Sequence, residues 1–535
     1  MLINEIDRFG SAEFSNAHNI QSAGLFTQIA DSLFVGFYGN RPLWYSGAGG
    51  VLLTAGARGG KLATVLGYNL CHGIGSAYST VNLDMKGELA PISQNQTPDG
   101  KHCIYWNPMG LHGLPQHSIN PLDGMRGEDP ALVSKVKMFC ENIIQASGSA
   151  NSKYFEDRAR EFVEGITVTL ARLDGVPTYP RLYGIINLIP GNSDAWLDFA
   201  YEMHISGYPL SVRIEEEIAA ARQGDGNAGG FQGILGEVFR AFSALSDPLL
   251  MASVSPPYDF SFEQLCQSGQ LYQVNLMPPA EFISSWAPVI KSMFVAGMVY
   301  KAERPDAPRQ TWILDECAQL GGFPLITKLF TYGAGIGIRP VAVFQSKKQM
   351  RAIGQDAESI IASSAALRMY FAIRDIESAT DVSRMLGAQT LEYDDEEKQA
   401  AARLAKQQAM NALLMGEDPF RAGADYRHHR DMSEHRSKMH RLLRTPDEVL
   451  NMPPNKMYLF ADGLASPIYA DRKPYWEQKF MAGRFHPNPY HPPAGKVRVK
   501  TTFGHAWRRV ITEPVPARFA HYPQYQEGHW SRIDP

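Results

Sequence analysis

Residues 55–62, Ala-Gly-Ala-Arg-Gly-Gly-Lys-Leu, have the composition of a loop that binds phosphate groups. Small residues let consecutive backbone N–H groups wrap around phosphates, and a lysine at the start of a helix can reach the terminal ones. The predicted nucleotide-binding residues are Gly56, Ala57, Arg58, Gly59, Gly60, Lys61 and Leu62. Ala55 stands where the first Gly of such a loop belongs, and Leu62 where a Ser or Thr would bind Mg²⁺. The segment by itself fits a Gly-rich turn with a surface lysine equally well.

Two adjacent carboxylates, Asp315 and Glu316, follow the apolar run 312–314. In nucleotidases with a phosphate loop, the Asp orients Mg²⁺ through water, and the Glu polarises the water that attacks the γ-phosphate. Gln345 follows another apolar run, 341–344, and can sense the γ-phosphate from there. The predicted catalytic residues are Lys61, Asp315, Glu316 and Gln345, with Asp315 holding Mg²⁺ through water. Together they predict ATP and Mg²⁺ as cofactors, and the simpler alternative is a strand that ends in a solvated acidic turn.

Basic residues are dense between positions 421 and 444, and a basic helix can follow a phosphate backbone. The candidate DNA-binding residues are Arg427, Arg430, Arg436, Lys438 and Arg441. A solvated helix face or a surface between subunits explains the same charges at least as well. The histidines of this segment do not have the spacing of a metal site.

Strands and helices must position these groups. A strand is predicted at 51–54 and a helix from about 61 to 70, followed by a strand at 77–85. This order is typical of a parallel βαβ unit. Further strand-like runs occur at 271–276, 311–314 and 340–344. The sequence therefore predicts an α/β domain with a mainly parallel sheet.

Between 131 and 250, apolar residues such as Val133, Val136 and Phe139 recur at helical spacing, and few strands are expected. We interpret this segment as an all-α domain inserted into the α/β domain, with a Gly-rich loop at 224–230. The predicted domains are 1–130 and 251–395 for the two parts of the nucleotide-binding domain, 131–250 for the insertion, and 396–535 for the C-terminal part. That last part is expected to begin with a long polar helix. Beyond Pro453 it becomes a Pro- and aromatic-rich tail without a regular repeat of helices or strands.

The composition excludes several classes of protein. The 51 Lys and Arg against 55 Asp and Glu give a net charge of −4, so any contact with DNA needs a local basic surface. The five scattered cysteines are typical of reduced thiols in the cytosol. No signal peptide is recognisable at the N-terminus. The apolar stretch 286–300 is interrupted by Lys291 and is predicted to be a buried helix rather than a membrane span.

The order of these motifs resembles the TraG-like family of type IV secretion coupling proteins from about residue 9 to about residue 480. The phosphate loop has Arg58 in the characteristic middle position. Segments similar to family motifs are 9–14, 83–88 (Leu-Asp-Met-Lys-Gly-Glu), 120–123 (Asn-Pro-Leu-Asp), 155–160, 314–321, 335–346, 375–387 and 444–449. The family's usual pair of N-terminal membrane helices has no counterpart, so we expect a membrane-free or truncated member.

The resemblance implies a RecA-like P-loop ATPase domain interrupted by an all-α domain, which assembles into a homo-hexameric ring. It implies that Lys61, Asp315, Glu316 and Gln345 form the nucleotide site and that a neighbouring subunit supplies an arginine finger, for which Arg374 and Arg339 are the candidates. The implied partners are DNA (single-stranded or relaxase-bound), relaxase or effector proteins, and the ATPases and inner-membrane components of a type IV secretion channel. The expected location is the cytoplasm, at the inner face of the bacterial inner membrane.

The leading hypothesis is a P-loop ATPase that couples DNA or protein substrates to a secretion channel. The alternative is a nucleotide-binding recruitment scaffold whose loop has decayed and turns over little ATP.

Overall fold

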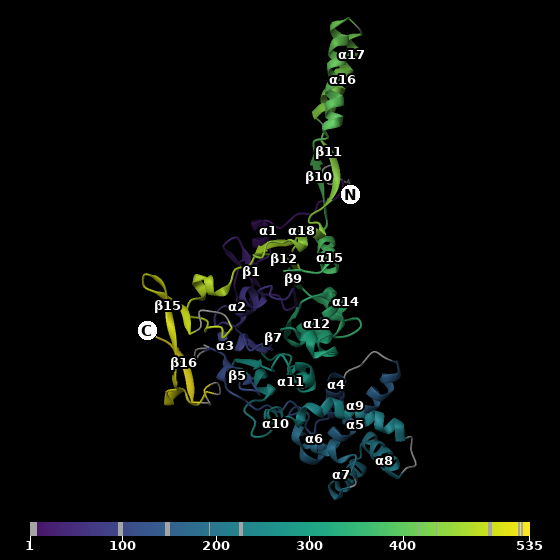
Figure 1. The fold of residues 1–535 in the computed structure, drawn as a ribbon, viewed down its shortest axis with the longest axis vertical. Coiled ribbons are helices and arrows are strands. Elements are labelled where there is room, and N and C mark those ends of the chain that lie inside the picture. The colour runs from purple at the N-terminus through teal and green to yellow at the C-terminus, as the bar shows by residue number, and fades with distance from the viewer. Residues whose placement is uncertain are drawn as a thin grey trace. The chain divides into compact units, whose positions relative to one another are not determined.

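The computed structural model describes residues 8–94, 100–144, 150–191, 193–223, 228–416, 418–434, 436–490, 495–522, 525 and 528–534 (Figure 1). The chain forms two compact units. The large unit comprises Ala17–Ala372, Pro453–Leu464 and Tyr469–Pro535, and the small unit comprises Met1–Asn16, Ile373–Met452 and Ala465–Ile468. Part of the predicted Gly-rich loop 224–230 lies outside the described residues.

The large unit is built on an 11-stranded sheet with the order β2-β1-β13-β12-β9-β3-β8-β7-β4-β6-β5. The strands are β1 (Leu33–Tyr38), β2 (Arg41–Tyr45), β3 (Val51–Ala55), β4 (Ser79–Leu83), β5 (His102–Trp106), β6 (Tyr272–Leu276), β7 (Gln310–Leu314), β8 (Ile338–Phe344), β9 (Leu367–Phe371), β12 (Lys456–Ala461) and β13 (Ile468–Asp471). Neighbouring strands from β9 to β5 run parallel. The pairs β12–β9, β1–β13 and β1–β2 are antiparallel.

Both faces of this sheet are covered. Strands β3, β4, β6, β7 and β8 are buried at every position, as expected for parallel strands between two layers of helices. Alternate residues of β5 belong to different clusters, with Ile104 and Trp106 in one and Cys103 and Tyr105 in the other. The apolar runs that predict these strands are therefore near-continuous rather than alternating.

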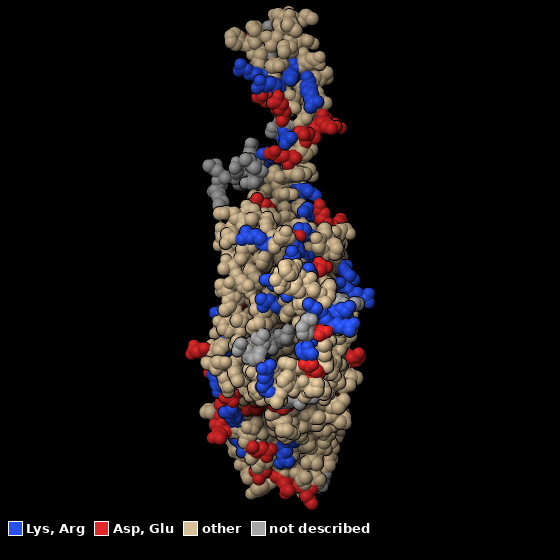
Figure 2. Space-filling model, turned by 90° about the vertical axis from the view of Figure 1, so that its left-hand side faces the viewer, with Lys and Arg blue, Asp and Glu red and all other residues tan. Residues whose placement is uncertain are grey.

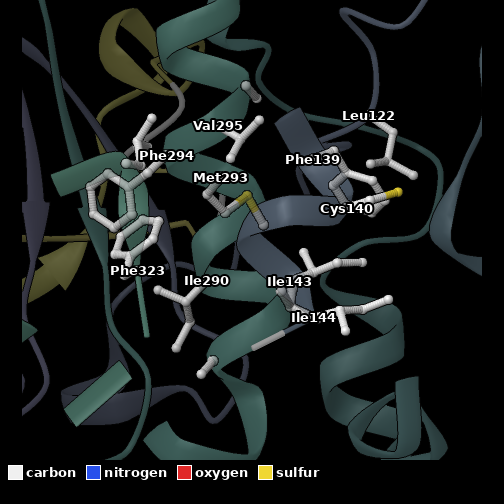
Figure 3. Packing of buried hydrophobic residues seen from close by; sticks show 14 of the residues in the cluster. Leu122, Phe139, Cys140, Ile143, Ile144, Ile290, Met293, Phe294, Val295 and Phe323 are labelled. Carbon is white, nitrogen blue, oxygen red and sulfur yellow. The ribbon is translucent and has the colours of Figure 1, made fainter. Parts of the chain in front are cut away.

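Helices α4 (Leu132–Ile143), α11 (Ile283–Glu303) and α12 (Pro324–Ile336) supply much of the largest apolar cluster. Figure 3 shows Phe139 and Ile143 of α4 facing Ile290 and Met293 of α11. The predicted buried helix at 286–300 is confirmed by α11, which contains the buried Lys291. In the part of the chain that the structure describes, no helix combines the length and the apolar character that a bilayer crossing requires.

Only helices lie between β5 and β6 in the described residues of the large unit. They are α4, α5 (Ala150–Asp174), α6 (Tyr179–Leu188), α7 (Asp194–Ile205), α8 (Pro209–Gln223), α9 (Ala228–Phe242) and α10 (Pro248–Ala252), with short 3-10 turns. The smaller described helices of the large unit outside this region are α1 (Ala17–Ser22), α2 (Gly67–Leu70), α3 (Leu89–Ser93), α13 (Lys347–Arg351) and α14 (Ala357–Ser364). The predicted interruption of a parallel sheet by a helical insertion is present.

The small unit corrects one prediction. The single long helix expected after 396 is wrong, because the chain forms two helices that pack together, α16 (Glu396–Leu414) and α17 (Pro419–Glu434). Gly416 has a φ of +84°, which ends a helix, and Pro419 is well suited to begin the next one. The unit also contains α15 (Ile376–Leu386), α18 (Pro446–Leu450) and the antiparallel strands β10 (Ala388–Tyr393) and β11 (Ser437–Leu442).

The tail beyond Pro453 is more regular than its composition indicates. It supplies β12 and β13 to the main sheet and forms a separate antiparallel sheet of three strands. These strands are β14 (Lys496–Thr501), β15 (Gly504–Pro514) and β16 (His529–Ile533).

Candidate functional site

The predicted nucleotide-site residues follow three adjacent strands of the large unit, and a further carboxylate, Asp84, follows a fourth. Strands β3, β8, β7 and β4 are neighbours and parallel, so their carboxyl ends meet at one edge of the sheet. The phosphate loop follows β3, Gln345 follows β8, Asp315 and Glu316 follow β7, and Asp84 follows β4. The topology therefore brings together groups that are far apart in the sequence.

The phosphate loop is a tight turn stabilised by its own backbone. Gly59 N donates to Gly56 O at 3.0 Å, and Gly56 N donates to Ala372 O of the β9 end at 3.2 Å. Arg58 has a φ of +57° and Gly60 of +78°, so both lie in the left-handed region. A Cβ on Gly59 would lie 2.8 Å from both Gly56 O and the Cβ of Ala372, which leaves no room for a side chain.

The helix after the loop begins with a π-helical turn, Leu62–Leu66, which continues into α2. This agrees with the helix predicted from about 61 to 70. The Leu62 side chain packs against the apolar cluster that includes Tyr68 and Tyr475. An apolar residue in place of Ser or Thr is therefore explained by packing. The nearby hydroxyl of Thr64 donates to Gly60 O at 2.9 Å.

Lys61 lies between the two predicted catalytic carboxylates. Its Nζ is 2.7 Å from Asp315 Oδ1 and 2.7 Å from Glu316 Oε1, and the three side chains are 13%, 11% and 7% exposed. Burial opposes the charged lysine, but the two carboxylates outweigh it and raise the pKa of Lys61. Burial raises the pKa of Asp315, and Lys61 only partly offsets that rise. In this arrangement, the cation that is suited to phosphate instead offsets part of the charge of the acidic pair.

Glu316 has more polar contacts than its partner. Gln319 Nε2 donates to Glu316 Oε2 at 2.8 Å, and Lys86 Nζ is 3.8 Å from Glu316 Oε1. Burial tends to raise the pKa of Glu316, but Lys61, Lys86 and a hydrogen bond from the Gln345 side chain lower it on balance. Gln345 thus contacts Glu316. Gln319 is a second contact of Glu316, which no sequence motif indicates.

Asp84 is a further buried carboxylate at this edge. Leu83 pairs with Leu314, so the ends of β4 and β7 lie side by side. Asp84 accepts from the backbone N–H of Glu88 at 3.0 Å and of Ala90 at 2.8 Å. Burial raises the pKa of Asp84 to about 6 despite these donors. The Asp-Met-Lys-Gly-Glu segment thus positions Asp84 and brings Lys86 near Glu316.

Arg472 braces the phosphate loop from the C-terminal tail. Its guanidinium donates to Gly59 O at 2.7 Å, to Thr64 Oγ1 at 3.3 Å, and to the carbonyls of Lys456 and Pro454. It also stacks 4.0 Å above the Phe371 ring. Burial lowers the pKa of Arg472 to about 10, and the side chain is 5% exposed. Nothing in the sequence near Arg472 indicates this contact.

The two arginine-finger candidates, Arg339 and Arg374, differ in their exposure to solvent. A finger must project from one subunit into the site of another, but Arg339 is 4% exposed and pairs with Asp31 at 3.1 Å. It also donates to Gly47 O and Thr311 Oγ1 near the opposite, amino end of the strands. Arg339 is therefore the wrong candidate. Arg374 follows the end of β9 and is exposed, so it stays a candidate.

The predicted basic helix is only partly a helix. Arg427 and Arg430 lie on α17, Arg436 follows it, and Lys438 and Arg441 lie on β11. Four of these five residues pair with carboxylates: Arg430 with Asp431, Arg436 with Asp394, Lys438 with Glu392 and Arg441 with Glu448. These pairs reduce the local positive charge available to a phosphate backbone.

The residues present fit a nucleotide with a divalent cation. Loop N–H groups and Lys61 suit phosphate oxygens. Asp315 Oδ1 is a buried carboxylate oxygen that lacks a hydrogen-bond donor in the described residues apart from the Lys61 ammonium. Such an oxygen is the type of ligand that Mg²⁺ prefers.

Comparison with known proteins points in the same direction. The model of a family described as type IV secretory system conjugative DNA transfer matches residues 3–494. A probable conjugal transfer protein TraG of Sinorhizobium fredii (strain NBRC 101917 / NGR234) is 29% identical over 203 residues, or 36% of this chain and 31% of that protein. The chain thus matches about a third of the length of this relative.

Two similar solved structures are of one protein. The bacterial conjugative coupling protein TrwBdeltaN70 in complex with sulphate has a TM-score of 0.58 and 15% identity, and the match covers 88% of this chain and 98% of that one. TrwB in complex with ADP and Mg²⁺ has a TM-score of 0.58 and 15% identity, with 88% and 96% covered. This likeness confirms the predicted fold class, a mainly parallel α/β sheet interrupted by a helical insertion.

Proposed function

Since the chain belongs to the conjugative DNA transfer family of type IV secretory systems, we propose that it is an ATP-hydrolysing coupling protein. In this proposal it recruits relaxase–DNA complexes, or effector proteins, and delivers them to a secretion channel. The observation that carries the hydrolytic part is the contact of Lys61 with both Asp315 and Glu316 at 2.7 Å. A phosphate loop and an acidic pair lie within one salt bridge of each other.

The proposed mechanism uses the residues in the following way. The backbone N–H groups of Gly56 and Gly59 already donate within the protein, so the other loop N–H groups and the Lys61 ammonium would hold the phosphates. Lys61 must therefore leave the carboxylates when a nucleotide binds. Asp315 would hold a Mg²⁺ ion through water, and such an ion would supply positive charge next to the phosphate oxygens. Glu316 polarises the attacking water, and Gln345, already bonded to Glu316, senses the γ-phosphate.

The proposed assembly is a homo-hexamer at the cytoplasmic face of the bacterial inner membrane, near the ATPases and membrane components of the channel. Arg374 is the proposed finger into a neighbouring site. Its exposure and its place after β9, whose neighbour β3 leads into the loop, support this assignment.

A recruitment scaffold with little turnover is the second candidate. The observations that favour it are Ala55 at the first loop position and Leu62, whose side chain is committed to apolar packing. In this case the site would bind nucleotide, and the acidic pair would stay bound to Lys61.

The test is steady-state ATPase activity of the purified chain, with and without single-stranded DNA, beside Glu316→Gln and Lys61→Ala. We expect DNA-stimulated hydrolysis in the wild type, a loss of at least a hundredfold in Glu316→Gln with ATP still bound, and loss of nucleotide binding in Lys61→Ala. Arg351→Gln is the matched control, because its partner Glu358 lies on α14 (Ala357–Ser364), outside the acidic pair. ATP binding without hydrolysis in the wild type would favour the scaffold. Equal turnover in all variants would refute the site.

A further inference from the structure

The small sheet of β14, β15 and β16 has two chemically different faces. Directly paired residues of antiparallel strands lie on the same face, and alternate residues along a strand lie on opposite faces. The pairs on one face of β14 and β15 are Lys496 with Arg509, Arg498 with Trp507, and Lys500 with His505. This face, called the basic face below, therefore carries Lys, Arg, His and Trp at all six positions.

The opposite face fixes the orientation of the sheet. Val497 is fully buried, and Val499, Val510 and Ile533 pack against the same aromatic cluster of the large unit. Because the valines of β14 alternate with its basic residues, anchoring the valines directs the basic face to solvent. Lys496, Lys500, Trp507 and Arg509 are accordingly exposed.

The positive charge of the basic face is not cancelled locally. Glu513, the acid on this side of β15, pairs with Arg532 Nε at 2.6 Å and accepts from Trp530 Nε1 at 3.3 Å. Among the residues that the structure describes, no carboxylate forms an ion pair with Lys496, Lys500 or Arg509. The candidate DNA-binding residues of α17 and β11 differ in this respect, because most of them are paired with acids.

Aromatic side chains accompany these charges. Trp507 is 49% exposed beside Arg498, and Phe503, in the turn between β14 and β15, is 100% exposed. Large exposed rings amid unpaired cations are typical of surfaces that bind single strands, where bases stack on the rings and cations follow the phosphates. A duplex would hide its bases from such rings. Figure 2 looks onto the side where Figure 1 draws β15 and β16, and Lys and Arg gather near its mid-height.

We propose that the basic face of β14 and β15 binds single-stranded nucleic acid. Lys496, Lys500 and Arg509 contact phosphates, and Trp507 stacks on a base. The proposal deepens the proposed function and rests on it for the source of the strand, a DNA substrate in transit. Strand β14 begins at Lys496, beyond residues 3–494 that the family model matches.

The experiment measures binding of the full chain to a fluorescent oligothymidylate by anisotropy, without nucleotide, across a salt series. The test variant is Lys496→Gln/Lys500→Gln/Arg509→Gln. The matched control is Arg181→Gln/Arg213→Gln/Arg240→Gln, which removes three exposed arginines from the helical insertion. We expect the test variant to bind at least tenfold more weakly at low salt. Its slope of log affinity against log salt should be less negative by about 2, since each phosphate contact on a single strand contributes about 0.7.

Trp507 gives an independent readout. Trp507→Ala should lower affinity roughly tenfold with an unchanged salt slope, whereas Trp507→Phe should keep most of the affinity, because only the ring is needed for stacking. Photocrosslinking to an oligonucleotide that contains iododeoxyuridine should label Trp507 or Phe503. Circular dichroism of each variant checks that the sheet is intact.

Three results would overturn the proposal: unchanged binding and slope in the triple variant, an equal loss in the control, or binding to phosphatidylglycerol vesicles without binding to the oligonucleotide. The outcome is separable from that of the proposed function. An inactive ATPase that still binds the strand through Trp507 would refute the coupling ATPase and leave this surface standing. DNA-stimulated hydrolysis in the wild type, together with unchanged oligothymidylate binding and slope in the triple variant, would support the coupling ATPase and refute this surface.

Discussion

Replacing Arg472 by Met tests whether the C-terminal tail holds the phosphate loop in its shape. Four hydrogen bonds from a charged donor are each worth about 1.5 kcal/mol or more. The cost of burying the charge opposes them, because a pKa lowered from 12.5 to about 10 corresponds to about 3 kcal/mol. The net contribution of the side chain is then about 3 kcal/mol, and Met fills most of the space that the guanidinium leaves.

The loss should fall on both stability and nucleotide binding. Two of the four bonds reach Gly59 and Thr64, so about half of the net energy acts on the loop and its helix. We expect Arg472→Met to lower the thermal unfolding temperature by a few degrees. We also expect it to raise the dissociation constant for a fluorescent ADP analogue roughly tenfold. Arg472→Lys should recover part of the stability but little of the affinity, since one ammonium cannot span four acceptors.

Arg484 provides the matched control. It also donates to backbone carbonyls, those of His72 and Phe480, but it does not touch the loop. Arg484→Met should cost some stability and leave ADP affinity unchanged. If a folded Arg472→Met protein bound ADP as tightly as the wild type, the loop would hold its shape without this brace and the reasoning would fail.

Two further predictions follow from buried positions. Burial lowers the pKa of Lys291 to about 7, and its Nζ has Gly322 O as acceptor at 2.5 Å. The unfolded chain keeps this proton up to its ordinary pKa, so the native lysine costs most stability below pH 7, and that cost falls as pH rises from about 7 to about 10. Lys291→Met should therefore unfold at a higher temperature than the wild type at pH 6, with a margin that shrinks by pH 9; a margin independent of pH would contradict this. Gly59→Ala should abolish ADP binding in titrations while the fold persists, because the new Cβ would lie 2.8 Å from Gly56 O. The control variant Gly335→Ala should bind ADP normally, because the space around Gly335 is open. Normal binding by Gly59→Ala would show that the loop can yield.

The parts of the site that could be predicted are those whose residues are neighbours in the sequence. Residues 55–62 and the pair Asp315–Glu316 each follow an apolar strand, so local composition identified them and parallel topology explains how they meet. Arg472 could not be predicted, because it lies 413 positions from Gly59 and its bonds go to backbone carbonyls, which carry no sequence signal. The burial of Arg339 could not be predicted either, because its partner Asp31 is remote in the sequence.

The elements of the fold likewise divide into those that the sequence predicts and those that it does not. Apolar runs predict five of the seven parallel strands, namely β3, β4, β6, β7 and β8. The parallel strands β5 and β9 are not predicted, nor are β12 and β13, which are short strands in a Pro-rich tail. One missed strand did carry a signal: Lys-Val-Arg-Val-Lys at 496–500 alternates with the period of a half-buried strand. The polar pattern predicts one helix where the structure has α16 and α17, because Gly416 and Pro419 mark only a short interruption.

The strand order of the main sheet has a consequence for synthesis of the chain. The hairpin β1–β2 is made early, yet it joins the sheet through β13 and β12, which come from residues 456–471. On the ribosome, the seven parallel strands can assemble while this hairpin still waits for its partners. Arg472 emerges directly after β13, so the phosphate loop receives its brace at the same late stage. Nucleotide capture is thereby coupled to synthesis of the segment that contains Arg472, and a fragment that ends before residue 456 would lack β13, the strand partner of β1 on the side opposite β2.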